Sequence, residues 1–165
     1  MIVPCFQLEY WDFVMKIELD VMDGKILDIL QSDARTTLAE IGRRIHLSQP
    51  AVAERVRRLE AAQVIVGYHA RVNPAALGYP ITAFIRVAKR VHETPLEVVA
   101  AQLPEVVECH SITGDDCGVV KVVAASVTDL ERVILALTRC GVTSSSLILS
   151  SSIERKSLRP SLTSA

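Results

Sequence analysis

The segment Thr37–Glu60, with the sequence TLAEIGRRIHLSQPAVAERVRRLE, contains two short helical patterns separated by a tight break. Thr37 and Glu40 have the spacing of a capping box, in which a hydroxyl and a carboxylate each accept a hydrogen bond from a free amide at the helix start. Ser48 is a favourable N-cap for the second pattern, and Pro50 lies in its first turn, where a missing N–H does no harm. These features predict a helix-turn-helix, whose second helix enters the major groove of DNA.

Apolar spacing identifies the side of the second helix that faces away from the protein. Val52, Val56 and Leu59 fall on one side when each residue advances by about 100°. Small residues and arginines occupy the other sides, which suits close approach to base edges and contacts with phosphate or guanine. Arg55 falls near the edge of the buried side, so we expect it to form a structural ion pair or to bind a phosphate. The residues predicted to contact DNA are Thr37, Ser48, Gln49, Pro50, Ala51, Glu54, Arg57 and Arg58.

A solvated helix is an alternative interpretation of the same arginines. In that case, Arg57 and Arg58 pair with Glu54 and Glu60 and bind no nucleic acid. The capped helix and the turn before the arginines favour the DNA-binding interpretation.

The charge of the chain is uneven along its 165 residues, although the net charge is only -1. Residues 23–73 carry eight Lys/Arg and six Asp/Glu, whereas residues 80–154 carry six and nine. The basic excess therefore lies in the part that contains the helix-turn-helix. So weak an excess predicts weak DNA binding by one copy, because affinity grows with the number of phosphates neutralised. We therefore expect a homodimer or a higher assembly.

The cysteines show no pattern of a metal site or of a disulfide framework. Cys5, Cys109, Cys117 and Cys140 form no C-x-x-C motif and no cluster with histidine. They are expected to be free thiols in a reducing cytoplasm. No P-loop or G-x-G-x-x-G phosphate cradle occurs, so we predict no cofactor and no metal. The first 14 residues are too short and too charged for a membrane span, which predicts no membrane partner.

The second half of the chain follows the order β-α-β-β-α-β. Strands are expected at residues 81–88, 106–112, 119–125 and 142–153, and helices begin at Thr94-Pro95 and at the capping box Thr128–Glu131. This order predicts a ferredoxin-like fold, with two helices on one face of an antiparallel sheet. The other face carries Val, Ile and Ala, which predicts a dimer built sheet to sheet.

The whole chain is therefore expected to be an α+β protein, with a winged helix-turn-helix followed by the ferredoxin-like domain. Its first helix spans Asp20–Ser32, and β-rich residues 64–72 form the wing. The predicted segments are an N-terminal extension (1–18), the DNA-binding domain (19–66), a hinge strand or linker (67–80), the effector-binding and dimerisation domain (81–154) and a basic C-terminal tail (155–165).

An ordered set of short motifs resembles one known family. Leu19-Asp20, Asp23 and Lys25-Ile26-Leu27 resemble its opening L-D-x-x-D-x-K-I-L, residues 47–68 resemble its recognition helix and wing entry, and Thr113-Gly114-Asp115 resembles the start of its effector loop. By these motifs the chain resembles the Lrp/AsnC (feast/famine) transcriptional regulators over roughly residues 19–155. The resemblance implies a DNA-binding homodimer, often assembled to a tetramer or octamer, that responds to an amino acid or a similar metabolite. This effector binds between effector domains, near that loop and the last strand.

The expected effector-binding residues depart from the family pattern. After Thr-Gly-Asp, the family commonly has an aromatic residue, then an aspartate, then an aromatic or aliphatic residue, where this chain has Asp116, Cys117 and Gly118. The effector is therefore expected to be unusual or absent, and a simple polar turn is an equal alternative. The residues implied are Gly114, Asp115, Asp116, Cys117, Thr143 and Ser145. His46 stands where the family often has Gly, which predicts a slightly strained turn residue.

Two other functions fit the same fold. Siroheme decarboxylases resemble this family, and a tetrapyrrole pocket here would use His110, Arg86 and Tyr79. An architectural protein that wraps DNA without an effector is the second alternative. Exposed Arg57 and Arg58 favour DNA over a tetrapyrrole, so we predict no catalytic residue and a regulator, not an enzyme.

Overall fold

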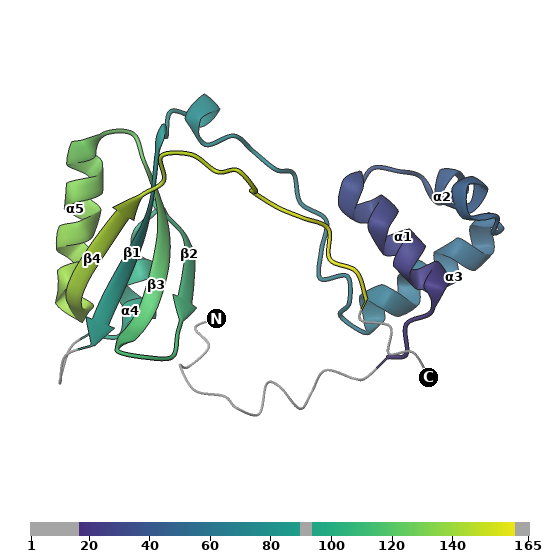
Figure 1. Cartoon of the computed structure of the whole chain (residues 1–165), viewed down its shortest axis with the longest axis horizontal. Coiled ribbons are helices and arrows are strands. Elements are labelled where there is room, and N and C mark those ends of the chain that lie inside the picture. Colours follow the sequence, from purple (N-terminus) through teal and green to yellow (C-terminus); the bar gives the residue numbers. More distant parts are fainter. Residues whose placement is uncertain (1–16, 90–93, 161–165) are drawn as a thin grey trace. The chain divides into compact units, whose positions relative to one another are not determined.

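The computed structural model describes residues 17–89 and 94–160 of the chain. The N-terminal extension predicted over residues 1–18 lies almost entirely outside them. The described residues form two compact units (Figure 1). One is helical and contains residues 17–70 together with 153–160; the other contains residues 71–152 and is built on a sheet.

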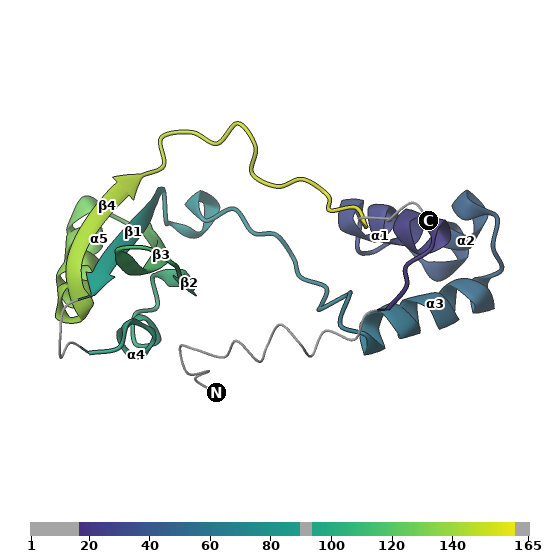
Figure 2. The ribbon, with the colours of Figure 1, turned by 60° about the horizontal axis from the view of Figure 1, so that its bottom comes forward.

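Three helices form the helical unit: α1 (Val21–Ser32), α2 (Leu38–Ile45) and α3 (Gln49–Ala61) (Figure 2). Each helix contributes to one apolar core because its hydrophobic residues recur at helical spacing. The buried residues of this core are Ile26, Ile41, Ile45, Val52, Val56 and Leu59. The apolar face predicted for the second helix of the helix-turn-helix is thus confirmed.

The starts of these helices are capped by side chains, as predicted. Asp20 and Asp23 cap α1 reciprocally, because each carboxylate accepts from the other residue's backbone N–H. Thr37 Oγ1 accepts from the Glu40 N–H at 3.2 Å at the start of α2. The Glu40 carboxylate binds Arg43 and Arg44 instead of the Thr37 backbone. Only the hydroxyl half of the predicted capping box is therefore formed.

The turn between α2 and α3 depends on two residues with unusual backbone surroundings. His46 adopts φ 60° and ψ 41°, the left-handed conformation that its sequence position predicts. The Leu47 N–H then donates to the Gly42 carbonyl at 2.9 Å. A Cβ at Gly42 would lie 2.4 Å from the Leu47 carbonyl oxygen, so only glycine permits this close approach.

The second unit confirms the predicted ferredoxin-like arrangement. Its strands are β1 (Ile81–Lys89), β2 (Val106–Ser111), β3 (Asp116–Ala124) and β4 (Gly141–Leu147), and its helices are α4 (Leu96–Ala100) and α5 (Val127–Leu137). Short 3-10 turns occupy Ala75–Leu77 (η2) and Thr138–Cys140 (η3). The sheet order is β2-β3-β1-β4, and the β1–β3, β1–β4 and β2–β3 pairs are all antiparallel.

The core of this unit lies between the helices and one face of the sheet. Ala83, Ile85 and Val87 of β1 are fully buried there, together with residues of α4 and α5. The intervening residues of β1 point to the opposite face, where Phe84 and Arg86 are exposed. No element among residues 17–89 and 94–160 covers this second face of the sheet, which we call the uncovered face.

The predicted β-strands of a wing over residues 64–72 are absent, which corrects that detail of the helix-turn-helix domain. The Val64 and Ile65 N–H groups both donate to the Leu59 carbonyl, at 2.9 and 3.1 Å. Both side chains pack against the helical core. Their amides and apolar surface are therefore used to end α3, and they pair with no strand. The expected hinge strand over 67–80 is likewise coil, interrupted by η2.

Three predicted boundaries in the sheet unit also need correction. β3 begins at Asp116, because the backbone of the presumed turn already pairs with Ala88. β4 ends at Leu147, where its pairing with Ala83 of β1 ends. Ser126 caps α5 by accepting from the Asp129 N–H at 3.1 Å, so the predicted capping box at Thr128 is wrong.

Candidate nucleic-acid interface and effector site

The predicted DNA-contacting residues lie at the start of α2 and along α3. Thr37 and Ser48 are the N-caps of these helices, and Pro50 lies in the first turn of α3. The exposed residues of this set are Thr37, Ser48, Gln49, Pro50, Glu54, Arg57 and Arg58, whereas Ala51 is half-buried. The structure thus presents the candidate residues on solvent-accessible surface, as a DNA contact requires.

Arg57 is held on the surface of α3 by Glu54. Its Nη2 lies 2.6 Å from Glu54 Oε1, and its Nε donates to Oε2 at 3.0 Å. This two-point pair lowers the pKa of Glu54 and raises the pKa of Arg57. The solvated-helix interpretation described this contact correctly. The pair is exposed, so it contributes little to stability and can exchange its partner for a phosphate.

Arg55 and Arg58 serve a different purpose, because both bind α1. Arg55 Nη1 lies 2.7 Å from Asp20 Oδ2 and 2.8 Å from Asp23 Oδ1, and Arg58 Nη2 binds Asp23 Oδ2. Asp23 is fully buried. The hydrogen bond from the Asp23 N–H and the bond from Arg55 lower the pKa of Asp20. The prediction of a structural ion pair for Arg55 is confirmed, and Arg58 shares it through an aspartate that sequence analysis had assigned only to the helix opening.

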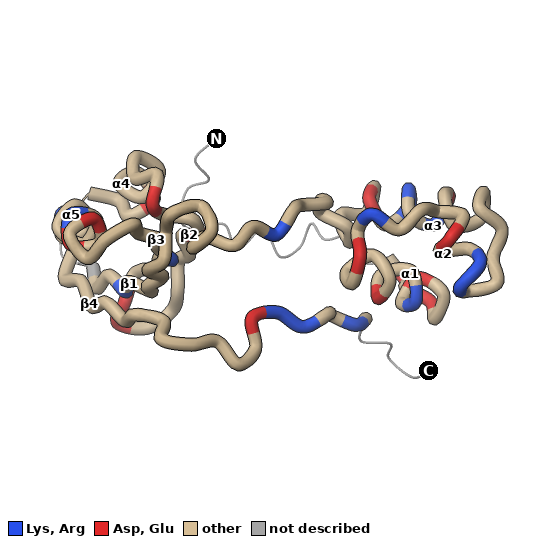
Figure 3. The backbone as a smooth tube through the Cα atoms, turned by 90° about the horizontal axis from the view of Figure 1, so that it is seen from above, with Lys and Arg blue, Asp and Glu red and all other residues tan. Residues whose placement is uncertain are grey.

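The exposed arginines of α2 are also paired with a carboxylate. Arg44 Nε donates to Glu40 Oε1 at 2.7 Å, and Arg43 binds the other oxygen. These bonds lower the pKa of Glu40. Figure 3 shows basic and acidic positions close together on α2 and α3. The surface is therefore one of paired charges, which explains the small net basic excess of this part of the sequence.

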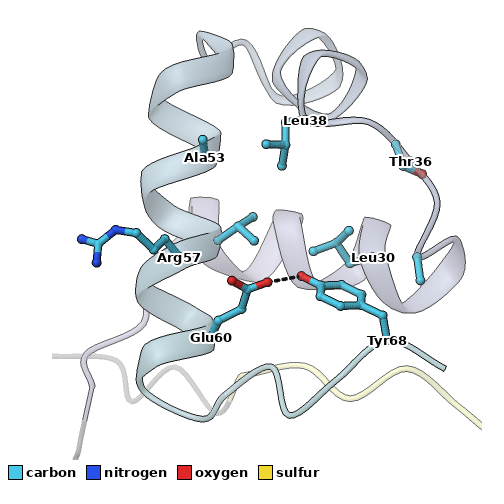
Figure 4. A pocket seen from close by; sticks show the side chains of 9 residues that line it. Leu30, Thr36, Leu38, Ala53, Arg57, Glu60 and Tyr68 are labelled. Carbon is cyan, nitrogen blue, oxygen red and sulfur yellow. Dashed lines mark hydrogen bonds between the residues drawn. The ribbon is translucent and has the colours of Figure 1, made fainter.

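A pocket that sequence analysis did not predict lies beside α3 (Figure 4). Its volume is about 370 Å³, and its apolar wall includes Leu30 and Leu38. Tyr68 lies across it and donates from its hydroxyl to Glu60 Oε1 at 2.9 Å. Burial, and then the bond to Glu60, raises the pKa of Tyr68 to about 12. Glu60 thus binds the tyrosine, and it forms no pair with Arg57 or Arg58 in the described residues.

The candidate effector loop connects β2 to β3. Gly114 has φ 109°, and Asp115 is exposed beside it in the turn. Asp116 lies at the start of β3, where its Oδ2 is 3.9 Å from Arg86 Nε on the uncovered sheet face. Cys117 lies at a β-bulge, and its thiol is 3.2 Å from the Val87 carbonyl oxygen. Asp116 thus presents a carboxylate beside the Arg86 guanidinium of β1, while Cys117 turns inward.

Gly118 stands where the family commonly has a bulkier residue. A Cβ at this position would lie 2.4 Å from Leu96 Cδ2 and 2.9 Å from the His110 carbonyl oxygen. The glycine is therefore a consequence of close packing between β3, β2 and α4. In the sequence, the only indication of this packing was that Gly118 departs from the family pattern.

The polar residues of the last strand lie on the other side of the sheet. Thr143 pairs with Val87 and Ser145 with Ile85 in the register of β4 with β1. Both partners face the helices, so Thr143 and Ser145 point to that side, whereas Asp116 accompanies Arg86 on the uncovered face. A single chain therefore does not bring the two halves of the predicted effector site together.

The residues of the tetrapyrrole alternative are only partly brought together. His110 and Arg86 are the two register neighbours of Val119, so they flank it on the uncovered face. Tyr79 lies outside the sheet, in the coil after η2. No group of three possible metal ligands occurs among residues 17–89 and 94–160. None of the helices in those ranges is long and apolar enough to cross a bilayer.

Comparison with known proteins identifies both units. The model of the AsnC-type helix-turn-helix domain matches residues 19–60, and that of the Lrp/AsnC ligand binding domain matches residues 82–158. The HTH-type transcriptional regulator LrpA of Mycobacterium tuberculosis is 38% identical over 119 residues, which are 71% of this chain and 79% of that protein.

Solved structures give the same result. The structure of Bacillus subtilis LrpC is 29% identical, covers 84% of this chain and 100% of that one, and has a TM-score of 0.79. The feast or famine regulatory protein from M. tuberculosis, complexed with L-methionine, is 33% identical, covers 87% and 100%, and has a TM-score of 0.79. The chain therefore belongs to the Lrp/AsnC family of transcriptional regulators.

Proposed function

We propose that this protein is a sequence-specific DNA-binding transcriptional regulator of amino-acid or related metabolism, and that a small metabolite modulates it. The observation that carries the proposal is a capped helix-turn-helix whose second helix exposes Arg57 and the small residues before it. The names of its relatives, such as LrpA, support the same function. DNA binding also implies a location in the cytoplasm, and nothing in the site calls for catalysis.

Arg57 is proposed to be the main basic contact of α3 with DNA. Its present partner, Glu54, is three residues away on the same exposed surface, and the pair is easily broken because both groups are hydrated. A phosphate or a guanine would replace the carboxylate as the acceptor. Arg58 is expected to contribute less, because it must first leave buried Asp23. The N-caps Thr37 and Ser48 and the adjacent Gln49, Pro50 and Ala51 would position the helix starts against the phosphate backbone.

The effector is proposed to bind where two copies of the sheet unit meet. A relative has been solved with L-methionine, which supports an amino acid or a similar zwitterion as the ligand. Asp116 and Arg86 would bind its amino and carboxylate groups, and Gly114, Asp115 and Cys117 would form the loop around it. Thr143 and Ser145 face the other side of the sheet, so they would have to come from a second copy. The proposal therefore requires at least a homodimer, which can assemble to a tetramer or octamer.

A mobility-shift titration on DNA from upstream of the protein's own gene tests the DNA contact. Arg57→Ala is expected to weaken specific binding by about 5- to 150-fold, the equivalent of 1–3 kcal/mol. Arg132→Ala is the matched control, since it removes the same charge from α5, where Arg132 binds Glu105. Equal affinities of the wild type and Arg57→Ala would refute the proposed interface.

Repeating the titration with a panel of amino acids tests the effector. One amino acid should change the DNA affinity or the oligomeric state of the wild type, and Asp116→Ala should abolish that response while leaving DNA binding intact. Glu131→Ala, on the exposed surface of α5, is the control. A response that survives in Asp116→Ala would show that the β2–β3 loop is only a polar turn.

A further inference from the structure

The C-terminal segment of the chain returns to the helical unit and lies against α1. The side chain of Gln31 both donates a hydrogen bond to the backbone of Leu158 and accepts one from it. The side-chain Nε2 donates to the Leu158 carbonyl at 2.8 Å, and the Leu158 N–H donates to Gln31 Oε1 at 2.8 Å. One side-chain amide thus satisfies both backbone polar groups of Leu158, as a neighbouring strand would.

The next two residues of the segment contact the same flank of α1. Arg159 Nε lies 3.3 Å from Asp28 Oδ2. Pro160 packs over Gly24, where an added Cβ would lie 3.8 Å from its Cγ and Cδ. Gly24, Asp28 and Gln31 are separated by four and three residues, so they form one stripe along the helix. We call this stripe the α1 flank. Leu158, Arg159 and Pro160 follow it in order, toward the start of α1.

The charges of the two parts also favour contact between the C-terminal segment and the helical unit. Residues 17–70 carry seven Lys/Arg and eight Asp/Glu, a balance of -1. Residues 153–160 carry three Lys/Arg and one Asp/Glu, a balance of +2, so the helical unit reaches +1 only with this segment included. Figure 3 shows its one acidic position followed by basic ones. The attraction is local, because the Arg159–Asp28 pair is exposed and screened by salt.

We propose that the α1 flank is a docking surface for the chain's own C-terminal segment, with Gln31 as the residue that reads its backbone. Docking gives the chain a second connection between its units. The first is residues 62–80, which join α3 to β1, and the second is residues 148–157, which join β4 to the docked residues. The proposal goes beyond the regulatory function, since it requires neither DNA nor an effector.

Hydrogen–deuterium exchange on the full-length protein tests the docking directly. The Leu158 amide should exchange several-fold more slowly than its unstructured rate in the wild type, because it donates to Gln31. Gln31→Ala should raise that exchange rate by about 5- to 10-fold, the value of one hydrogen bond of about 1–1.4 kcal/mol. Helix α1 should stay intact, since alanine is the best helix former. Gln102→Ala, an exposed substitution in the sheet unit, should leave Leu158 unchanged.

A pair of substitutions at Gly24 tests the packing independently of Gln31. Gly24→Ala places its Cβ at an ordinary contact distance from Pro160, so the slow exchange of Leu158 should persist. Gly24→Leu projects further into the ring of Pro160 and should raise the Leu158 exchange rate to that of Gln31→Ala. An unprotected Leu158 amide in the wild type, or the same protection in all four variants, would overturn the proposal. DNA binding by the same proteins is a separate measurement, so a failure of the proposed function would not be confused with a failure of docking.

Discussion

His46 is the residue of the helix-turn-helix whose backbone conformation suits its side chain least. Its φ of 60° lies in the left-handed region, which costs a non-glycine residue about 1–2 kcal/mol. The imidazole is exposed and is not needed for the core. We therefore predict that His46→Gly raises the free energy of unfolding by about 0.5–1 kcal/mol, because the greater freedom of glycine in the unfolded chain offsets part of the relief. Urea denaturation measures the change.

Arg43→Gly is the control for this prediction. It introduces the same residue on the surface of the same helix, where the backbone is helical and glycine should destabilise by about 1 kcal/mol. A loss of stability in both variants would contradict the claim that the turn is strained at His46.

For the arginines of α3, the sequence predicted the role of Arg55 better than that of Arg58. Helical spacing placed Arg55 at the edge of the buried side, and it binds two aspartates of α1. Arg58 was predicted to lie away from the buried side, which is correct, but its partner is 35 residues away in the sequence. A long side chain can reach around a helix, and spacing within one helix contains no information about the acceptor on another. Asp23 lies three residues before buried Ile26, and this spacing was the available signal for its burial.

Among the elements, α1 and α3 are joined by a buried charge. Asp23 accepts from Arg55, from Arg58 and from the Asp20 N–H. We predict that Asp23→Ala lowers the free energy of unfolding by about 2–4 kcal/mol, because Arg58 and a helix-start amide lose their acceptor and Arg55 keeps only Asp20. Asp28→Ala, a half-buried aspartate of the same helix, should change it by less than about 1 kcal/mol. Equal effects in urea denaturation would show that the buried carboxylate does not hold the helices together.

Acid should weaken the same pair of helices. The pKa of Asp20 is lowered in the folded protein by its bond from the Asp23 N–H and by Arg55. A carboxylate with a depressed folded pKa stabilises the fold above its unfolded pKa of about 4, and that stabilisation is lost as the pH falls through the folded value. Asn retains the N-cap but not the charge, so Asp20→Asn should lose less stability than the wild type between pH 7 and pH 3. Parallel losses in urea melts at the two pH values would exclude this contribution.

The order of the elements was predictable from the sequence, whereas several of their ends were not. Apolar periodicity and turn residues gave the β-α-β-β-α-β order and the helices of the helix-turn-helix. The start of β3 at Asp116 was missed because Asp116, Cys117 and Gly118 have the composition of a turn, and pairing with β1 overrides it. The prediction of a wing was wrong for the opposite reason. Val64 and Ile65 have β propensity, but their amides donate to the carbonyl at the end of α3. Strand formation depends on a partner that local sequence does not specify.

For the whole molecule, the uncovered face of the sheet decides whether the candidate site is complete. Phe84 is 39% exposed at its centre, between Lys121 on β3 and Ser146 on β4. The uncovered face also carries Arg86 beside Asp116, while Thr143 lies on the face of the sheet that packs against the helices. The family resemblance placed Asp116 and Thr143 in one site, because the sequence gives no sheet face for a loop residue. Their division between the two faces of one sheet means that only an assembly of copies can unite them.

We therefore predict that Phe84→Lys dissociates the protein to monomers. The new charge would lie beside Lys121 and Arg86, so bringing two such faces together would bury the added lysine among like charges. Leu135→Lys is the control, since Leu135 is a 62% exposed apolar residue of α5, outside the sheet. Analytical ultracentrifugation should find monomers for Phe84→Lys alone. Phe84→Lys should also lose more DNA affinity than Arg57→Ala does. A monomer lacks every phosphate contact that the second copy would make. An intact oligomer in Phe84→Lys would place the subunit interface on another surface.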